Sequence, residues 1–136
     1  MTDRISRQQR SDNMRAVLGQ DTAPEIRVRQ IAHRLGYRFR LHRADLPGKP
    51  DLVFPRLGSV IFVHGCFWHQ HQGCRKGRIP QSNIEFWQSK LNRNVQRDAE
   101  NLVALKASGW KALVAWECET IDEKRLTGRL HRFLNR

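Results

Sequence analysis

The apolar stretch SVIFVHG, residues 59–65, constrains the fold more than any other part of this sequence. Its unbroken run of apolar residues from Val60 to Val63 leaves no polar face, which is typical of a central strand. A second run, KALVAW (111–116), predicts another buried strand. Helices must cover such strands, so the sequence predicts an α/β fold.

The remaining elements follow from capping and periodicity. The first helix is expected to begin at a capping box, Thr22-Ala-Pro-Glu25, and to end at Gly36. The others are a half-buried strand at 37–41, a strand at 51–54 after the loop 45–50, a helix from Ser82 or Asn83 to about Ser108 with an apolar stripe of Trp87, Leu91, Val95, Leu102 and Leu105, and a last helix opened by a second capping box, Thr120-Ile-Asp-Glu123. This order predicts one mixed sheet flanked by helices.

The chain length of 136 residues predicts a single domain, spanning 21–136. Residues 1–20 are polar and basic, and we expect them to form a flexible arm that orders on its partner. No apolar run approaches the roughly 18 residues of a membrane span, and the charged N-terminus lacks the apolar stretch of a signal peptide. We therefore expect a cytoplasmic protein, and we separately expect a monomer.

The net charge of +12, from 25 Lys and Arg against 13 Asp and Glu, favours a polyanionic partner. A basic protein without such a partner is one alternative. An anionic membrane is a weaker one, because no basic amphipathic helix with an aromatic face is evident. Nucleic acid is the partner that the composition favours.

Three cysteines and a histidine have the spacing of a metal site. Cys66, His71 and Cys74 form a C-x4-H-x2-C pattern within one loop, and Cys118 follows the strand 111–116. If that strand neighbours 59–64, Cys118 completes a Cys3His set, which is typical of structural Zn²⁺. The alternative is three unrelated buried thiols, kept reduced in the cytoplasm, and a surface histidine.

Two aromatic residues, Phe67 and Trp68, lie inside this loop. The loop has too little core of its own, and a bound zinc would stabilise it instead. The two rings would then not be needed for packing and could project outward to insert into a partner. The alternative is that both rings belong to the core.

Several residues at one predicted sheet edge suit a second metal site. Asp51 opens the strand 51–54, and His64 ends the next one, so Asp51, the Val63 carbonyl and His64 should meet. A carboxylate and a backbone carbonyl suit Mg²⁺. Asp51 capping a turn, and His64 as an edge histidine with ordinary partners, are the alternatives.

Two more residues complete this hypothesis. His69, outside the zinc set, could act as the general base that activates water, and Glu25 could reach the metal through water or orient a histidine. Alternatively His69 is a surface residue or replaces His71 as zinc ligand, and Glu25 only closes its capping box. On a basic protein the set indicates metal-assisted phosphodiester hydrolysis.

The chain resembles the very short patch repair (Vsr) DNA mismatch endonucleases. The matching stretches run in order along nearly the whole chain: RSDNMRA (10–16), DTAPE (21–25), LPGKPDLVF (46–54), VIFVHGCFWHQHQGC (60–74), FW (86–87), LNRNVQRD (91–98) and GWKALVAWEC (109–118). HGCFWH beside PGKPD is highly specific. The resemblance implies a restriction-endonuclease-like core, which agrees with the helix and strand order above.

The resemblance also implies an activity: Mg²⁺-dependent nicking of one DNA strand on the 5′ side of the thymine in a T:G mismatch. Such mismatches arise when 5-methylcytosine deaminates. The implied roles are Mg²⁺ held by Asp51 and the Val63 carbonyl, His69 as base with His64 and Glu25 supporting, Zn²⁺ on Cys66, His71, Cys74 and Cys118, and Phe67, Trp68 and Trp87 entering the duplex. Mismatch-repair proteins are a further class of partner that the sequence does not identify.

Two positions depart from the family's usual motif. Val63 stands where well-known members have threonine, which suits a ligand acting through its backbone carbonyl. The loop HQHQGC replaces a shorter, more histidine-rich one, so His69 and His71 both stay candidates for the zinc site. The acid and lysine that related nucleases place on the second strand are absent, which explains why histidines would carry the catalysis.

Three other functions compete with this hypothesis. They are a restriction-type nuclease that cuts both strands, a zinc-stabilised DNA-binding module that does not cut, and an RNA-binding protein that stacks bases on Phe67 and Trp68.

Overall fold

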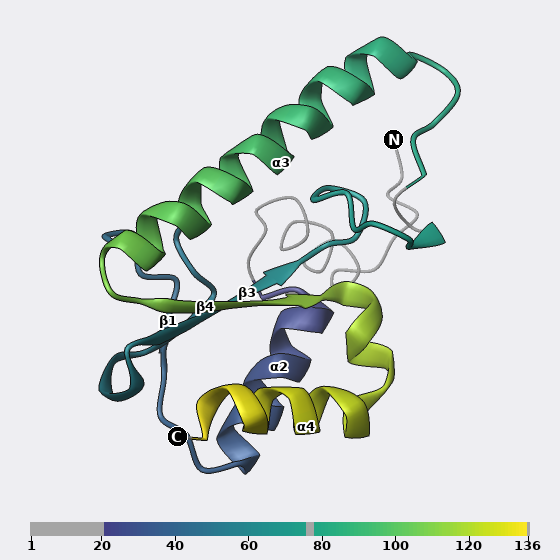
Figure 1. Cartoon of the computed structure of the whole chain (residues 1–136). Helices are drawn as coiled ribbons and strands as arrows, with labels where there is room; N and C mark the ends of the chain where they lie inside the picture. The colour runs from purple at the N-terminus through teal and green to yellow at the C-terminus, as the bar shows by residue number, and fades with distance from the viewer. Residues whose placement is uncertain (1–20, 76–77, 136) are drawn as a thin grey trace, which may run out of the picture.

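A computed structural model describes residues 21–75 and 78–135; the N-terminal arm expected at 1–20 lies outside these ranges. The elements in chain order are α2 (Ala23–Arg34), β1 (Arg40–Leu41), β2 (Leu52–Phe54), η1 (Pro55–Leu57), β3 (Ser59–His64), α3 (Ile84–Ala107), β4 (Lys111–Trp116), η3 (Glu117–Ile121) and α4 (Glu123–Leu134). The chain is therefore α/β, as predicted (Figure 1). Among the described helices, none has the length and apolar character needed to span a bilayer.

The four strands form one mixed sheet in the order β1-β2-β3-β4, which confirms the predicted architecture. β1, β2 and β3 pair antiparallel, whereas β3 and β4 pair parallel, with His64 opposite Trp116. The parallel pair needs a crossover connection, and α3 provides it. The C-terminal ends of β3 and β4 consequently lie side by side at the same end of the sheet.

Helices cover both faces of this sheet (Figure 1). On one face α2 and α4 pack through Ile31 and Leu130 against Leu52, Phe54 and Ile61. On the other face lie Val53, Val60 and Phe62, together with Leu105 of α3. Successive residues of a strand point to opposite faces, so a sheet covered on both sides requires an unbroken apolar run. This explains the sequence SVIFVH.

Two predicted strands differ from the observed ones: one is shorter and the other is less buried. The strand expected at 37–41 pairs only at Arg40 and Leu41, because Tyr37 and Phe39 turn toward Phe54, at ring distances of 6.5 and 5.8 Å. β4 was expected to be buried, but only Ala115 is, because β4 forms an edge of the described sheet.

The predicted helix caps also differ from the observed ones. Asn83 precedes α3, but its backbone is left-handed and its side chain makes no capping hydrogen bond. Asp122 rather than Thr120 caps α4, and its carboxylate accepts a hydrogen bond from the Arg125 N–H. Thr120 instead lies in η3 and donates to the Glu117 carbonyl. Of the apolar stripe predicted on α3, Leu91 and Leu105 are buried but Val95 is 41% exposed.

Candidate functional site

The start of β2 and the end of β3 meet at one edge of the sheet because the two strands are antiparallel. The Val63 N–H donates a 2.7 Å hydrogen bond to Asp51 Oδ2. Asp51, Val63, His64 and His69 together line a cavity of ≈ 230 Å³. The sequence prediction that these residues meet is therefore consistent with the fold.

Glu25 lies beside Asp51 and is 2% exposed. Its Oε2 accepts a 3.0 Å hydrogen bond from the Asp21 N–H and forms an ion pair with Arg29. The Thr22 hydroxyl accepts a hydrogen bond from the Glu25 N–H, but the Glu25 carboxylate does not close the predicted capping box on Thr22. A residue that only caps a helix needs neither this burial nor the ion pair with Arg29.

The electrostatics of the two carboxyl groups differ sharply. Burial, followed by the hydrogen bond with Glu25, raises the pKa of Asp51 to about 8. Burial also raises the pKa of Glu25, but hydrogen bonds with Asp51 and His42 outweigh it, so the net shift of the Glu25 pKa is downward. Two neighbouring carboxyl groups that do not readily ionise together share one proton, and the opposite directions of the two shifts favour Asp51 as its holder in the metal-free protein.

Asp98 of α3 orients His69. Its Oδ2 lies 2.6 Å from His69 Nδ1, and the His69 ring stacks on His64 with centroids 3.8 Å apart. Burial, followed by the nearby charge of His69, lowers the pKa of His64 to about 4, so His64 is neutral at physiological pH. The Asp98 contact favours a proton on Nδ1, which leaves Nε2 of His69 as an acceptor.

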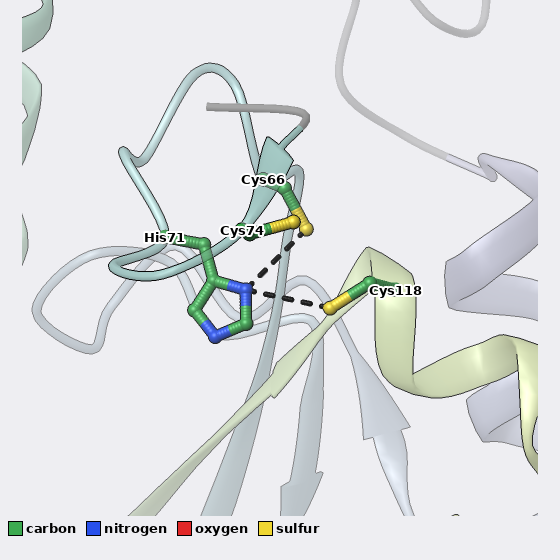
Figure 2. A group of neighbouring side chains, drawn as sticks. All are labelled: Cys66, His71, Cys74 and Cys118. Atoms are coloured by element: carbon green, nitrogen blue, oxygen red, sulfur yellow. Dashed lines mark hydrogen bonds between the residues drawn. The ribbon is translucent and has the colours of Figure 1, made fainter. Parts of the chain in front are cut away.

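The three cysteines converge on His71, not on His69. His71 Nδ1 lies 3.7 Å from Cys66 Sγ and 3.4 Å from Cys118 Sγ, and all four ligand atoms of the Cys66, His71, Cys74 and Cys118 group lie within 4.8 Å of one another. Figure 2 shows the four side chains pointing toward a common centre. Cys118 reaches it because β4 runs parallel to β3 and ends beside the loop.

This Cys3His cluster fits a tetrahedral zinc. Bond lengths of about 2.3 Å to sulfur and 2.0–2.1 Å to nitrogen separate the two ligand types by about 3.6 Å in a tetrahedron. The observed 3.4 and 3.7 Å agree with that value. Burial raises the pKa of the Cys66 thiol to about 12, and a bound cation would reverse this shift by stabilising the thiolate.

Four aromatic residues, Phe67, Trp68, Phe86 and Trp87, form a cluster between the loop and the start of α3, which we call the aromatic cluster. Neighbouring ring centroids are 5.1 to 5.9 Å apart. Trp68 is 47% and Phe86 58% exposed. The alternative that Phe67 and Trp68 belong to the core is not supported, because neither belongs to the apolar clusters on the two sheet faces.

Sequence reasoning missed four residues of this region: His42, Asp98, Asn94 and Asn101. Asn94 Nδ2 donates to the Trp68 carbonyl, at 3.1 Å, and Asn101 packs closely against Gly48 beside the cavity. Asn94, Asp98 and Asn101 follow one another at helical spacing, so a polar stripe on α3 was a readable signal. His42 had no such signal beyond its place after the alternating stretch 37–41.

Comparison with known proteins identifies similar sequences along the whole chain. The sequence model of the family described as "DNA mismatch endonuclease Vsr" matches residues 2–76. The type II nicking enzyme V.XorIIP of Xanthomonas oryzae pv. oryzae is 49% identical over 99% of this chain and 98% of its own. The DNA mismatch endonuclease Vsr of Escherichia coli K12 is 40% identical over 98% of this chain and 88% of its own, and the type II nicking enzyme V.NmeAIP of Neisseria meningitidis is 39% identical over 98% and 95%.

Proposed function

Because the chain belongs to the Vsr family of DNA mismatch endonucleases, whose members hydrolyse phosphodiester bonds, we propose that it nicks one strand of DNA at T:G mismatches. The nick falls on the 5′ side of the mismatched thymine. These mismatches form when 5-methylcytosine deaminates in a methylated sequence, so the nick starts their repair. Several relatives are named nicking enzymes, which favours cleavage of one strand over cleavage of both.

The observation that carries this proposal is the cavity shared by Asp51, Val63, His64 and His69. The Asp51 carboxylate and the Val63 carbonyl would hold Mg²⁺, which prefers oxygen ligands. A bound Mg²⁺ supplies positive charge to the phosphate oxygens as negative charge develops on them.

The side chains supply the proton transfer and the orientation. His69 accepts the proton of the attacking water at Nε2, because Asp98 lies 2.6 Å from Nδ1 and favours that tautomer. The neutral His64 ring stacks on His69 and fixes its plane. Glu25, held by Arg29 and Asp21, keeps a carboxylate against Asp51.

The aromatic cluster gives the selectivity. Opening a stacked base step costs a few kcal/mol, and a mismatched step opens more easily than a paired one. Phe67, Trp68 and Trp87 recover part of that cost by stacking on the bases, at roughly 1–3 kcal/mol per base. A zinc ion on Cys66, His71, Cys74 and Cys118 would hold the loop rigid, so little ordering entropy is lost on insertion.

The test is a strand-resolved nicking assay. A duplex with one T:G mismatch and its T:A control are labelled separately on each strand and incubated with the protein and Mg²⁺. We expect a nick only in the thymine strand of the mismatched duplex. Cleavage of both strands of the control would indicate a restriction-type nuclease, and tight binding without cleavage would indicate a DNA-binding module. Either result would reject the proposal.

A further inference from the structure

His42 points at the carboxylate pair, although no role in the proposed hydrolysis uses it. Its Nε2 lies 3.1 Å from both Glu25 oxygens and 3.8 Å from Asp51 Oδ1. Glu25 is buried and the other two side chains are about 15% exposed, and the ligand atoms of all three lie within 4.8 Å of one another. This arrangement places one nitrogen and two carboxylates around a common point.

The backbone directs His42 to this point. The residue has a φ of +48°, a left-handed conformation that is uncommon for residues other than glycine, although histidine adopts it more often than most side chains do. Its N–H donates a 3.3 Å hydrogen bond to the Asp51 carbonyl, which ties the end of β1 to the start of β2. Backbone conformations of this kind persist where the surrounding structure enforces them, and they cluster at functional sites.

The distances match those between ligands of one cation. Around a metal with bonds of about 2.1 Å, adjacent ligands of an octahedron are separated by about 3 Å. The His42–Glu25 separation of 3.1 Å corresponds to adjacent positions, and 3.8 Å to Asp51 needs only a small closure. Arg29 pairs with Glu25 Oε2, so Oε1 is the oxygen that would face the cation.

The donor atoms indicate which kind of cation would fit this point. They are one imidazole nitrogen and two carboxyl oxygens. Imidazole nitrogen binds divalent transition metals better than it binds Mg²⁺, which prefers an all-oxygen set.

We propose that His42 adds a nitrogen ligand to the divalent cation held by Asp51 and the Val63 carbonyl, with Glu25 as a further ligand, so that the site binds a transition metal such as Mn²⁺ more tightly than Mg²⁺. The inference rests on the proposed function only in placing a cation at Asp51. His42 thereby determines which metal the site prefers.

The competing role for His42 is to hold Glu25 by a hydrogen bond without touching the metal. His42→Gln separates the two roles, because the glutamine amide nitrogen can donate the same hydrogen bond but provides no imidazole ligand. His33→Gln is the matched control, since His33 is an exposed histidine in the last turn of α2.

The experiment measures Mn²⁺ binding to the zinc-loaded protein without DNA. Electron paramagnetic resonance gives the Mn²⁺ affinity, competition gives the Mg²⁺ affinity, and pulsed spectra detect nitrogen bonded to Mn²⁺. In the unsubstituted protein and in His33→Gln we expect a nitrogen coupling. In His42→Gln we expect that coupling to disappear and the preference for Mn²⁺ over Mg²⁺ to fall by about tenfold or more.

Absence of nitrogen coupling in the unsubstituted protein, or its persistence in His42→Gln, would overturn the inference. Asp51→Asn provides the separate check on the site, because it should abolish tight Mn²⁺ binding. If Asp51→Asn binds Mn²⁺ normally, the metal site of the proposed function is wrong. If Asp51→Asn fails to bind while His42→Gln retains the coupling, only the role of His42 is wrong.

Discussion

At the scale of single residues, a pair of carboxyl groups and a pair of histidines lie in or beside the cavity, and the members of each pair have different surroundings. Asp51 and Glu25 differ in the direction of their pKa shifts, and His69 differs from its stacking partner His64 in its contact with Asp98. Such paired differences are typical of catalytic sites, where one group must accept a proton and its neighbour must not.

The proposed role of His69 as a base held by Asp98 predicts the effect of two substitutions. His69→Ala should lower the nicking rate by about 10²–10⁴-fold, because the general base is lost. Asp98→Asn should lower it too, with DNA binding unchanged, because the amide no longer favours the Nδ1–H tautomer. Single-turnover nicking and a separate binding assay measure both effects. If His69→Ala instead releases zinc, the division of the histidines between the two sites is wrong.

The raised pKa of Asp51 predicts a pH dependence of folding stability in metal-free conditions. Its folded pKa of about 8 exceeds the unfolded value, so the folded state binds the extra proton and Asp51 favours folding at low pH. This contribution should decline as pH rises from about 4 to about 8. Asp51→Asn should flatten the decline and also abolish Mg²⁺-dependent nicking. Urea unfolding at several pH values measures the first effect, and an identical slope in the variant would contradict the assignment.

At the scale of elements, strand pairing determines which parts of the site could be read from the sequence. Asp51, Val63 and His64 were predictable as neighbours, because two consecutive strands with a short turn pair antiparallel. Cys118 was predictable only on the condition that β4 lies beside β3. The partners of His42 and Asp98 were not predictable, because they lie 17 and 29 positions away and only tertiary packing brings them together.

The start of α4 shows the same limit for local signals. Thr120 and Glu123 have the spacing of a capping box. However, Thr120 is part of η3, and Asp122 caps α4 instead. A short 3-10 helix after a strand has no sequence pattern that distinguishes it from the first turn of an α-helix.

The parallel pairing of β3 and β4 makes the zinc cluster dependent on two distant segments. Cys118→Ser should release zinc and unfold the loop, because metal binding and folding are coupled in such sites. Metal analysis together with thermal unfolding measures both. Purified, well-folded protein that contains no zinc would contradict the assignment of the cluster.

The aromatic cluster predicts a separation between stability and mismatch selectivity. Replacing Phe67 and Trp68 by alanine should leave zinc content and melting temperature nearly unchanged, because neither ring belongs to the two core clusters. Affinity for T:G duplex should fall markedly, and weak binding to paired DNA should not. A variant that loses several kcal/mol of stability, as a core truncation does, and keeps its mismatch preference would refute the role of these rings.

At the scale of the whole molecule, the positive charge and the aromatic cluster contribute differently to binding. The net charge of +12 attracts DNA through phosphate contacts that do not depend on sequence. In the proposed function, the aromatic cluster acts only at a base step that opens. Affinity and selectivity should therefore respond to different variables.

Salt titration separates these two contributions. Affinity for T:G and for T:A duplexes should fall with the same slope of log affinity against log salt, because both complexes make the same phosphate contacts. The ratio of the two affinities should stay constant. Fluorescence anisotropy at several salt concentrations measures both quantities. A ratio that falls toward one as salt rises would mean that mismatch selectivity is electrostatic.

The polar stripe on α3 has a consequence for where the DNA is cut. Asn94 donates to the Trp68 carbonyl and Asp98 contacts His69, so one helix would fix both the ring proposed to enter the duplex and the proposed general base. Four residues of helix separate them, a rise of about 6 Å. The offset between the opened step and the hydrolysed bond would then be set by α3 together with the loop that it holds. The distance from the mismatch to the nick would therefore be the same whatever sequence surrounds the mismatch.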